Sequence, residues 1–496
     1  MQRGSDALDV QYSCRRLAPA VCSLCVWRPV PGSCGLRAVS RLAAFSFPLP
    51  VGHGLPKKLK ERSKRMSNKV AAIDVGSEKM HVAIIHQQPR VFECFTDSLH
   101  RLKDYLKTEG VSSVAMEATG VYWLPVYTIL EAAGLEVVVV NGAHVKNVPG
   151  RKTDLQDCQW LAQLHAQGLL RGGFVPPAAI RKLRQYVRLR QDHVRSGSQH
   201  ILHMQKSLDL MNIKIHDVLS ETVGVSCLRM IRAMVAGQRN PMALLELCDK
   251  DVVRRKTDLL LRALRGTWDE EHLFSLQQAL EAWDFYQQQI AACDGAIEKV
   301  LKELAAQKSE PPPGAKPTMK RRRHNAPELP ELETLLHRLT GADLSALPCL
   351  SAYSQMLIVS EVGTDLSRWA TPQHFVSWLG LAPGSRHSGK RRRNQKRFRG
   401  AAGKIFCVIA RSLGRSKYLA LSGFYRRLRS TRGGQVANIA CARKIATLFY
   451  NALKHGIQYV EKGLVDYEKK YRQQAIQRMK KAATRFGLTL VEPQLA

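Results

Sequence analysis

The sequence predicts an α/β amino-terminal domain, a long helical and coiled-coil middle region, and a helix-rich, strongly basic carboxy-terminal domain. Three observations support this class. Short apolar strands alternate with helical segments between residues 70 and 167, as in a mixed sheet flanked by helices. Two later stretches repeat apolar residues at three-, four- and seven-residue steps, which is typical of coiled-coil-like helices. From Leu366 to Val460 there are 20 Lys/Arg and no Asp or Glu.

The amino-terminal domain is expected to open with a meander of three strands. These strands span residues 70–75, 80–85 and about 90–95. The following pattern predicts a helix over 98–108, a strand over 111–117, a helix over 122–133, a strand over 136–140 and a helix over 153–167. Pro176-Pro177 closes this unit.

The middle region is expected to form two long helices. The first has an apolar face of Ile180, Leu183, Val187 and Val194, surrounded by Arg181, Lys182, Arg184, Arg188, Arg190 and Arg195. The second carries the stripe Leu276, Leu280, Trp283, Ile290, Ile297, Leu301 and Leu304. Between residues 207 and 268 the periodicity is poor and predicts no architecture.

Composition sets the remaining boundaries. We expect a nuclease-like domain over 66–175, the helical region over 176–308, a Pro-rich and basic linker over 309–331, a basic domain over 332–463 and a basic helical tail over 464–496. Residues 1–65 hold only three acidic residues and many Arg, Pro and Cys. They are either a transit peptide or the product of a start codon assigned too early. We favour Met66 as the true start.

The charge balance points to a polyanionic partner. Lys and Arg number 76 against 41 Asp and Glu, which leaves a net charge of +35. Because phosphate neutralisation releases counterions, such an excess favours nucleic acid over a merely solvated basic surface. No apolar run approaches the roughly 18 residues of a membrane span. The scattered cysteines, including Cys22-x-x-Cys25, lack zinc spacing and indicate reduced thiols in a cytoplasmic protein.

Four acidic residues are spaced as a metal-dependent nuclease requires. Asp74 falls within an apolar strand, where a charge is costly unless it is paired or metal-bound. Glu117 ends another strand, and Asp154 and Asp157 share one face at the start of a helix. Alone, each has an ordinary explanation as a turn former, a strand end or a helix-dipole partner. Together they predict a site for two Mg²⁺ ions about 3.5–4 Å apart, with Mn²⁺ as a substitute.

The motifs around these acids resemble a known family. Ile73-Asp74-Val-Gly-Ser, Met116-Glu117-Ala-Thr-Gly120-Val-Tyr122 and Lys152-Thr-Asp154-Leu-Gln-Asp157 are similar to the DEDD transposases of bacterial insertion sequences, which include relatives of the Piv and MooV DNA invertases. The resemblance implies a RuvC-like, RNase H-like domain with the four acids as catalytic metal ligands. Some members are guided by a bridge RNA, so a non-coding guide RNA is a candidate partner beside double-stranded DNA.

The second half carries the same resemblance. Phe375-Val-Ser-Trp-Leu-Gly380-Leu-Ala-Pro383, followed by Ser388-Gly389, looks like the family's carboxy-terminal transposase domain, whose nucleophilic serine maps to Ser388. The basic residues expected to bind nucleic acid around it are Arg386, Lys390, Arg391, Arg392, Arg393, Lys396, Arg397 and Arg399. Clustered guanidinium groups would neutralise the charge that develops on phosphorus. The resemblance implies a composite site in which metals and serine cooperate through a phosphoserine intermediate.

One motif departs from the family. Where relatives have a glycine-containing helix-hairpin-helix turn, this chain has Leu347-Pro-Cys-Leu-Ser351, which weakens the case for a backbone contact to phosphate. The leading hypothesis is a transposase or site-specific recombinase of a bacterial insertion sequence, associated with the nucleoid. Two alternatives stay open: a stand-alone RuvC-like Holliday-junction endonuclease, and a catalytically decayed nucleic-acid-binding protein. The two helical stripes predict a homodimer or homotetramer.

Overall fold

The computed structural model describes residues 69–118, 120–141, 154–308, 325–383, 385–388, 391–394, 399–417, 419–456 and 463–489. The chain divides into two compact units, Met1–Val137 with Val145–Leu170, and Val138–His144 with Arg171–Ala496. The expected extension over 1–65 and most of the expected linker over 309–331 lie outside the described residues.

The first unit is built on a five-stranded sheet in the order β3-β2-β1-β4-β5. The strands are β1 (Val70–Val75), β2 (Lys79–Ile84), β3 (Arg90–Glu93), β4 (Ser113–Glu117) and β5 (Glu136–Val140). The first three strands form the antiparallel meander that the sequence predicts, and β1 pairs in parallel with β4. The sheet is therefore mixed, with β1 at its centre.

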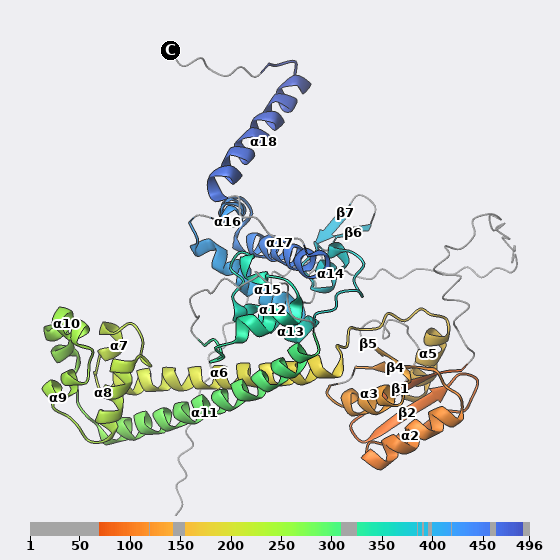
Figure 1. Ribbon diagram of the computed structural model, residues 1–496, viewed down its shortest axis with the longest axis horizontal. Helices are drawn as coiled ribbons and strands as arrows, with labels where there is room; N and C mark the ends of the chain where they lie inside the picture. Colours follow the sequence, from red (N-terminus) through yellow and green to blue (C-terminus); the bar gives the residue numbers. More distant parts are fainter. Residues whose placement is uncertain are drawn as a thin grey trace, which may run out of the picture. The chain divides into compact units, whose positions relative to one another are not determined.

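Helices cover both faces of this sheet. Val70 to Ile73 are at most 5% exposed although successive strand residues point to opposite faces. On one side α2 (Thr96–Thr108) packs with α3 (Trp123–Ala132), and α5 (Asp154–Ala166) packs over β1 and β2 (Figure 1). This arrangement confirms the predicted RNase H-like fold.

The second unit begins with two long helices that pack side by side, α6 (Ala178–Leu210) and α11 (Glu270–Ala306) (Figure 1). Residues of the predicted stripes, such as Leu183, Val187, Ile297 and Leu301, are buried. The residues between the two helices form α7 (Ile215–Val218), α8 (Val225–Val235), α9 (Pro241–Glu246) and α10 (Lys250–Ala263), which share a core with the helix ends. Helices α7 and α9 have only 4 and 6 residues, and α10 is kinked at Lys256, so the sequence shows no sustained period there.

One predicted surface residue of α6 is instead buried. Arg190 is 2% exposed and pairs with Asp294 of α11 through hydrogen bonds of 2.5 and 3.3 Å. Its Nη1 also donates to the Asn325 carbonyl at 2.9 Å. The expectation that Arg190 belongs to a basic surface around α6 is therefore wrong. A buried guanidinium needs this complete set of acceptors, which no local pattern reveals.

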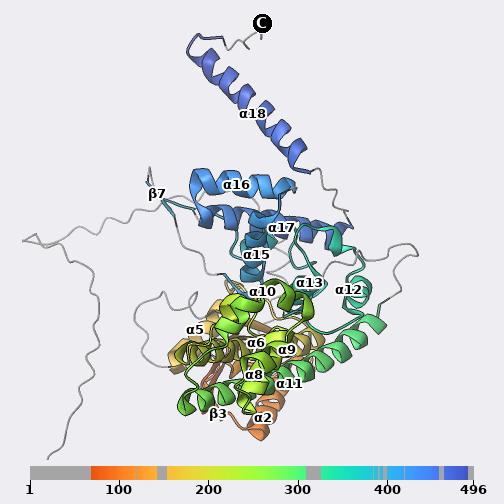
Figure 2. The same cartoon turned by 90° about the vertical axis from the view of Figure 1, so that its left-hand side faces the viewer.

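The rest of the second unit is helical around an aromatic core. Its elements are α12 (Leu332–Thr340), η1 (Leu344–Ala346), α13 (Ala352–Val362), α14 (Pro372–Trp378), β6 (Ser385–Ser388), β7 (Arg391–Asn394), α15 (Ala401–Ser412), η2 (Leu413–Arg415), α16 (Ala420–Arg432), α17 (Gly434–His455) and α18 (Gly463–Arg485). Helices α16 and α17 pack along each other (Figure 2). Phe375, Phe406 and Phe449 are fully buried and in ring contact.

Two further predictions concern the membrane and the thiols. Among the described helices, none combines the length and the apolar composition of a membrane span. The eight cysteines within the described part of the chain form no disulfide.

Candidate functional site

Two of the predicted carboxylates stand next to each other at one edge of the sheet. Ile73 of β1 is the register partner of Met116 of β4, and the two strands are parallel. Asp74 and Glu117 are the next residues along each strand. Since neighbouring strands lie about 4.8 Å apart and register partners point to the same face, both carboxylates lie on one face at the carboxyl ends of the strands.

The direction of α5 follows from one hydrogen bond. Ser113, the first residue of β4, shares a 2.9 Å hydrogen bond between its Oγ and Nε2 of His165, in the last turn of α5. The helix therefore runs back along β4, with its beginning toward Glu117. The rise from His165 to Asp157 is about 12 Å, and Ser113 to Glu117 spans about 13 Å. Asp157 is thus level with the carboxyl end of β4.

Cys158 fixes α5 against β1. Its thiol is buried and donates to the carbonyls of Ala72 at 3.3 Å and His81 at 3.0 Å. Burial raises the pKa of the Cys158 thiol to about 12, and the nearby Asp74 carboxylate adds to that increase. Asp154 precedes Cys158 by one helical turn, so both residues lie on the same face of α5.

These relationships bring the backbone positions of all four acids to one edge of the first unit. The side chain of Asp154 is outside the described set. Among the side chains that are described, no group of three or more His, Cys, Asp or Glu is arranged as a metal site. The chemistry of the four donors nevertheless fits a hard divalent cation, which prefers carboxylate oxygens.

Gly76 shapes the turn that follows Asp74. Its N–H donates to the Lys79 carbonyl at 3.0 Å, which closes the connection between β1 and β2. A Cβ at this position would lie 2.7 Å from the same carbonyl oxygen. Only glycine fits without a shift of the backbone, so the turn holds the end of β1 and with it the Asp74 position.

The predicted serine belongs to a short hairpin in the second unit. Strands β6 and β7 are antiparallel, with Ser388 opposite Arg391 and Arg386 opposite Arg393. Ser388 is therefore the last residue of a strand rather than a loop residue. Side chains between 384 and 398 are outside the described set, as are Lys390, Lys396 and Arg397 altogether. The backbone register alone places Ser388 across from an arginine.

Comparisons with known proteins cover both parts of this arrangement. A DEDD-type family model described as a transposase matches residues 71–213, a range that contains all four acids. A second model, described as the transposase IS116/IS110/IS902 family, matches residues 342–426, a range that contains Ser388 and the basic run. The chain belongs to the IS110 family of DEDD transposases. No curated protein matches it.

Membership implies two properties of this transposase. A DEDD nuclease-like domain implies dependence on a divalent metal, and a transposase binds DNA. Both agree with the carboxylate edge of the first unit and with the basic composition of the second. The expected surface of cations around the serine is one part of that basic region.

The departure at Leu347–Ser351 does not remove the turn from this transposase. Cys349 adopts a φ of 60°, a left-handed conformation that glycine normally supplies. Ser351 then caps α13, because its Oγ accepts from the Ser354 N–H at 3.3 Å. The hairpin between η1 and α13 therefore forms although the family's glycines are missing.

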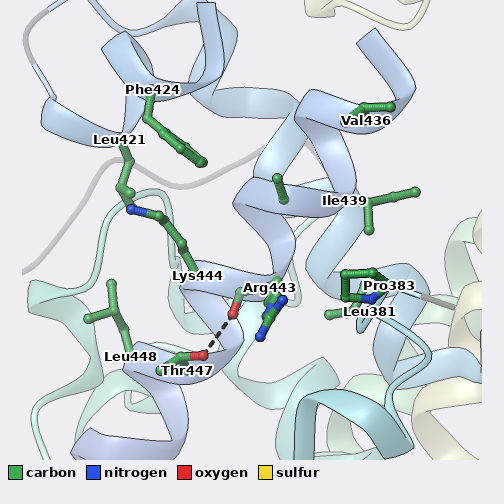
Figure 3. A pocket seen from close by; sticks show the side chains of 11 residues that line it. Leu381, Pro383, Leu421, Phe424, Val436, Ile439, Arg443, Lys444, Thr447 and Leu448 are labelled. Carbon is green, nitrogen blue, oxygen red and sulfur yellow. Dashed lines mark hydrogen bonds between the residues drawn. The ribbon is translucent and has the colours of Figure 1, made fainter. Parts of the chain in front are cut away.

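An apolar cavity of about 660 Å³ lies between α16 and α17 (Figure 3). Leu421 and Phe424 line it from α16, and Ile439 and Leu448 from α17. Lys444 Nζ lies over the Phe424 ring, 4.2 Å from the ring centroid. The lining is mostly hydrocarbon, and Arg443 and Lys444 also contribute to it.

A second cavity, with a basic lining, lies in the same transposase unit and was not predicted from the sequence. Its walls include one face of α15, where Lys404, Cys407, Val408 and Arg411 recur at three- and four-residue steps. That spacing is typical of one helical face, so this part of the lining could be predicted from the sequence. The parts of the lining that α16 and α17 contribute could not be predicted, because they depend on how three helices pack.

Proposed function

We propose that this transposase is a site-specific DNA recombinase that cuts and rejoins strands at the ends of a bacterial insertion sequence. The observation that carries the proposal is the register of β1 and β4, which makes Asp74 and Glu117 neighbours. The orientation of α5, with Asp157 level with Glu117, supports it.

Asp74, Glu117, Asp154 and Asp157 would hold the divalent ions, which we propose are two Mg²⁺ with Mn²⁺ as a substitute. When bound, such ions stabilise charge on the attacking and leaving oxygens of a phosphodiester. The contribution of the chain is to fix the donors. Gly76 sets the end of β1, and the Ser113–His165 and Cys158 contacts set the height of α5.

Ser388 is the proposed nucleophile. Its Oγ forms a bond to phosphorus, the bond from phosphorus to the deoxyribose oxygen breaks, the serine proton passes to solvent, and the leaving oxygen takes up a proton. Attack by a hydroxyl of another strand reverses these steps and releases the serine. The cations on the paired strand, beginning with Arg391 opposite Ser388, favour the charged transition state.

The carboxylates belong to the first unit and Ser388 to the second. We propose that they act on the same phosphodiester, from one chain or from two subunits of a homodimer or homotetramer. A guide RNA is the proposed second partner, since 20 Lys/Arg without a carboxylate between Leu366 and Val460 provide a long surface for a polyanion. Binding to DNA would keep the protein on the bacterial nucleoid.

The test is recombination of two plasmids that carry the element ends. Asp74→Asn and Ser388→Ala should each abolish recombination and leave DNA binding within about twofold. Ser385→Ala, at the other end of the same strand, is the matched control and should recombine normally. With wild-type protein, a DNA–protein adduct that survives denaturation should form and should map to Ser388. Normal recombination by Ser388→Ala would refute the serine mechanism.

The same assay separates the alternatives. Mg²⁺-dependent nicking of branched DNA that survives Ser388→Ala would favour a stand-alone junction endonuclease that uses only the first unit. The absence of cleavage of any element-end or branched DNA with Mg²⁺ or Mn²⁺ would favour a nucleic-acid-binding protein without activity. Copurified RNA whose loops match the DNA junctions would support the guide.

A further inference from the structure

A cavity of about 690 Å³ lies between α15, α16 and the start of α17. Four cationic side chains line it: Arg399, Lys404, Arg411 and Arg429. No carboxylate lines it among the described residues, and none occurs between Leu366 and Val460. Four converging cations without an anion repel one another, which requires a negatively charged ligand or counterions.

Two polar atoms of the lining have no hydrogen-bond partner within the described part of the chain. They are Nε of Arg399 and Oδ1 of Asn438, and both atoms are buried. A buried polar atom without a partner costs about 1–3 kcal/mol, so native proteins rarely leave one unsatisfied. The Arg399 Nε–H requires an acceptor, and Asn438 Oδ1 requires a donor.

These two needs define the ligand. A phosphate group offers acceptors to Arg399 but no proton donor to Asn438. A nucleotide offers both, since its phosphate accepts and the edge of its base carries N–H groups. The wall also contains Gln435, a second amide, and amide side chains bond to the edges of bases.

The base must be unpaired to use this site. In a duplex the pairing edge is occupied and only the groove edge stays open. A base stacked between its neighbours cannot enter a cavity between three helices unless it leaves the stack. The cavity volume lies within the range of about 300–1,000 Å³ that is common for pockets of small ligands. The absence of a side chain at Gly433 and Gly434, next to Gln435, leaves the approach to the first turn of α17 open.

We infer that this cavity binds an unpaired nucleotide of a DNA or RNA strand, with its phosphate among Arg399, Lys404, Arg411 and Arg429 and its base against Asn438 and Gln435. The inference rests on the proposed function only in taking nucleic acid as the ligand. It adds a binding site for a single-stranded segment to the proposed cleavage residues. Strand exchange and guide pairing both require such a site.

The test measures binding of short fluorescent oligonucleotides by full-length Asp74→Asn protein in EDTA, so that catalysis has no influence. Three probes are compared: a mixed-sequence DNA strand, the same strand in RNA, and an abasic phosphodiester strand of equal length. Base-bearing strands should bind at least about tenfold more tightly than the abasic strand. Equal binding of all three would overturn the assignment of a nucleotide. A preference for RNA over DNA, or the reverse, would identify the source of the strand.

Charge variants locate the site. Arg411→Gln/Arg429→Gln should weaken binding of the base-bearing DNA strand at least about tenfold more than the matched pair Arg415→Gln/Arg432→Gln, which removes two exposed cations outside the cavity. The slope of log K against log salt should fall in magnitude by up to about 0.7 for the cavity pair, the value for one lost phosphate contact. Equal effects of the two pairs would refute the site.

Asn438→Leu distinguishes ligand recognition from a structural role. It should weaken base-bearing strands about fivefold or more and leave the abasic strand unchanged. Since Oδ1 has no hydrogen-bond partner among the described residues, the leucine variant should melt no lower than its parent. A lower melting temperature with unchanged binding would show that Asn438 serves the fold. Photocrosslinks from a halogenated base should map to residues 404–411 or 425–439, and crosslinks confined to other peptides would contradict the inference.

Discussion

Ser113 and His165 share a 2.9 Å hydrogen bond that ties the start of β4 to the end of α5. This contact, at the edge opposite the carboxylates, decides which way α5 runs and therefore where Asp157 lies. It joins residues 52 positions apart. A polar pair far from the chemistry thus positions a predicted metal ligand.

His165 makes the first unit sensitive to acid. Burial lowers its pKa below the ordinary 6.5, although Glu136 opposes the decrease. As the pH falls below about 6.5, the unfolded chain takes up the proton before the folded one, and stability is lost. Above that pH both states are neutral and the effect vanishes. We expect the urea midpoint of the wild type to fall between pH 7.5 and 5.5, and to fall less in His165→Gln. Equal decreases would exclude His165 as the cause.

Gly76→Ala should disturb the turn behind Asp74. The new Cβ would meet the Lys79 carbonyl at 2.7 Å, so the backbone must shift. We expect a loss of about 1–3 kcal/mol in unfolding free energy and a large loss of recombination. Gly295→Ala on α11 is the control, because its Cβ would meet nothing within 4 Å. Alanine there should stabilise the helix by about 0.5–1 kcal/mol. Calorimetry of both variants checks the opposite signs.

Cys349 offers a direct test of backbone strain. Its φ of 60° is unfavourable for any residue with a Cβ. Cys349→Gly and Cys349→Ala both delete the thiol, so the difference between them isolates the backbone. Because Cys349 lies in the turn between η1 and α13, the glycine variant should have an unfolding free energy about 1 kcal/mol higher than the alanine variant. If alanine melts at the higher temperature, the turn does not have the described conformation.

Arg190 and Asp294 form the most buried ion pair described in the chain, with side chains 2% and 7% exposed. Arg190→Met leaves the Asp294 carboxylate buried without its partner and should cost about 3–5 kcal/mol. The double variant Arg190→Met/Asp294→Leu should recover most of that loss. Chemical unfolding of the two single variants and the double variant measures the coupling. Additive losses would mean that the pair does not act as a unit.

The sequence predicts some parts of this protein well and others not at all, for physical reasons. The period of two in β1 and β4 marks their ends, so Asp74 and Glu117 were recognisable as strand-end acids. Their adjacency depends on register, which only the folded sheet shows. The burial of Arg190 was hidden because its partner lies 104 residues away.

The serine region shows the same limit. The run at Arg391–Asn394 has no apolar alternation, so nothing in it predicted a strand. The cavity that contains Asn438 needs three helices to exist, and only the α15 face was visible in the sequence. Local patterns predict elements, whereas sites made by several elements depend on long-range packing.

The carboxylate-free stretch also bears on the lifetime of the protein. Twenty like charges between Leu366 and Val460 oppose compaction unless an external anion screens them. A bound nucleic acid should therefore stabilise the folded state, and we expect unbound molecules to unfold more readily. A mobile element built on such a protein would keep its active copies few and confined to the strands on which they work.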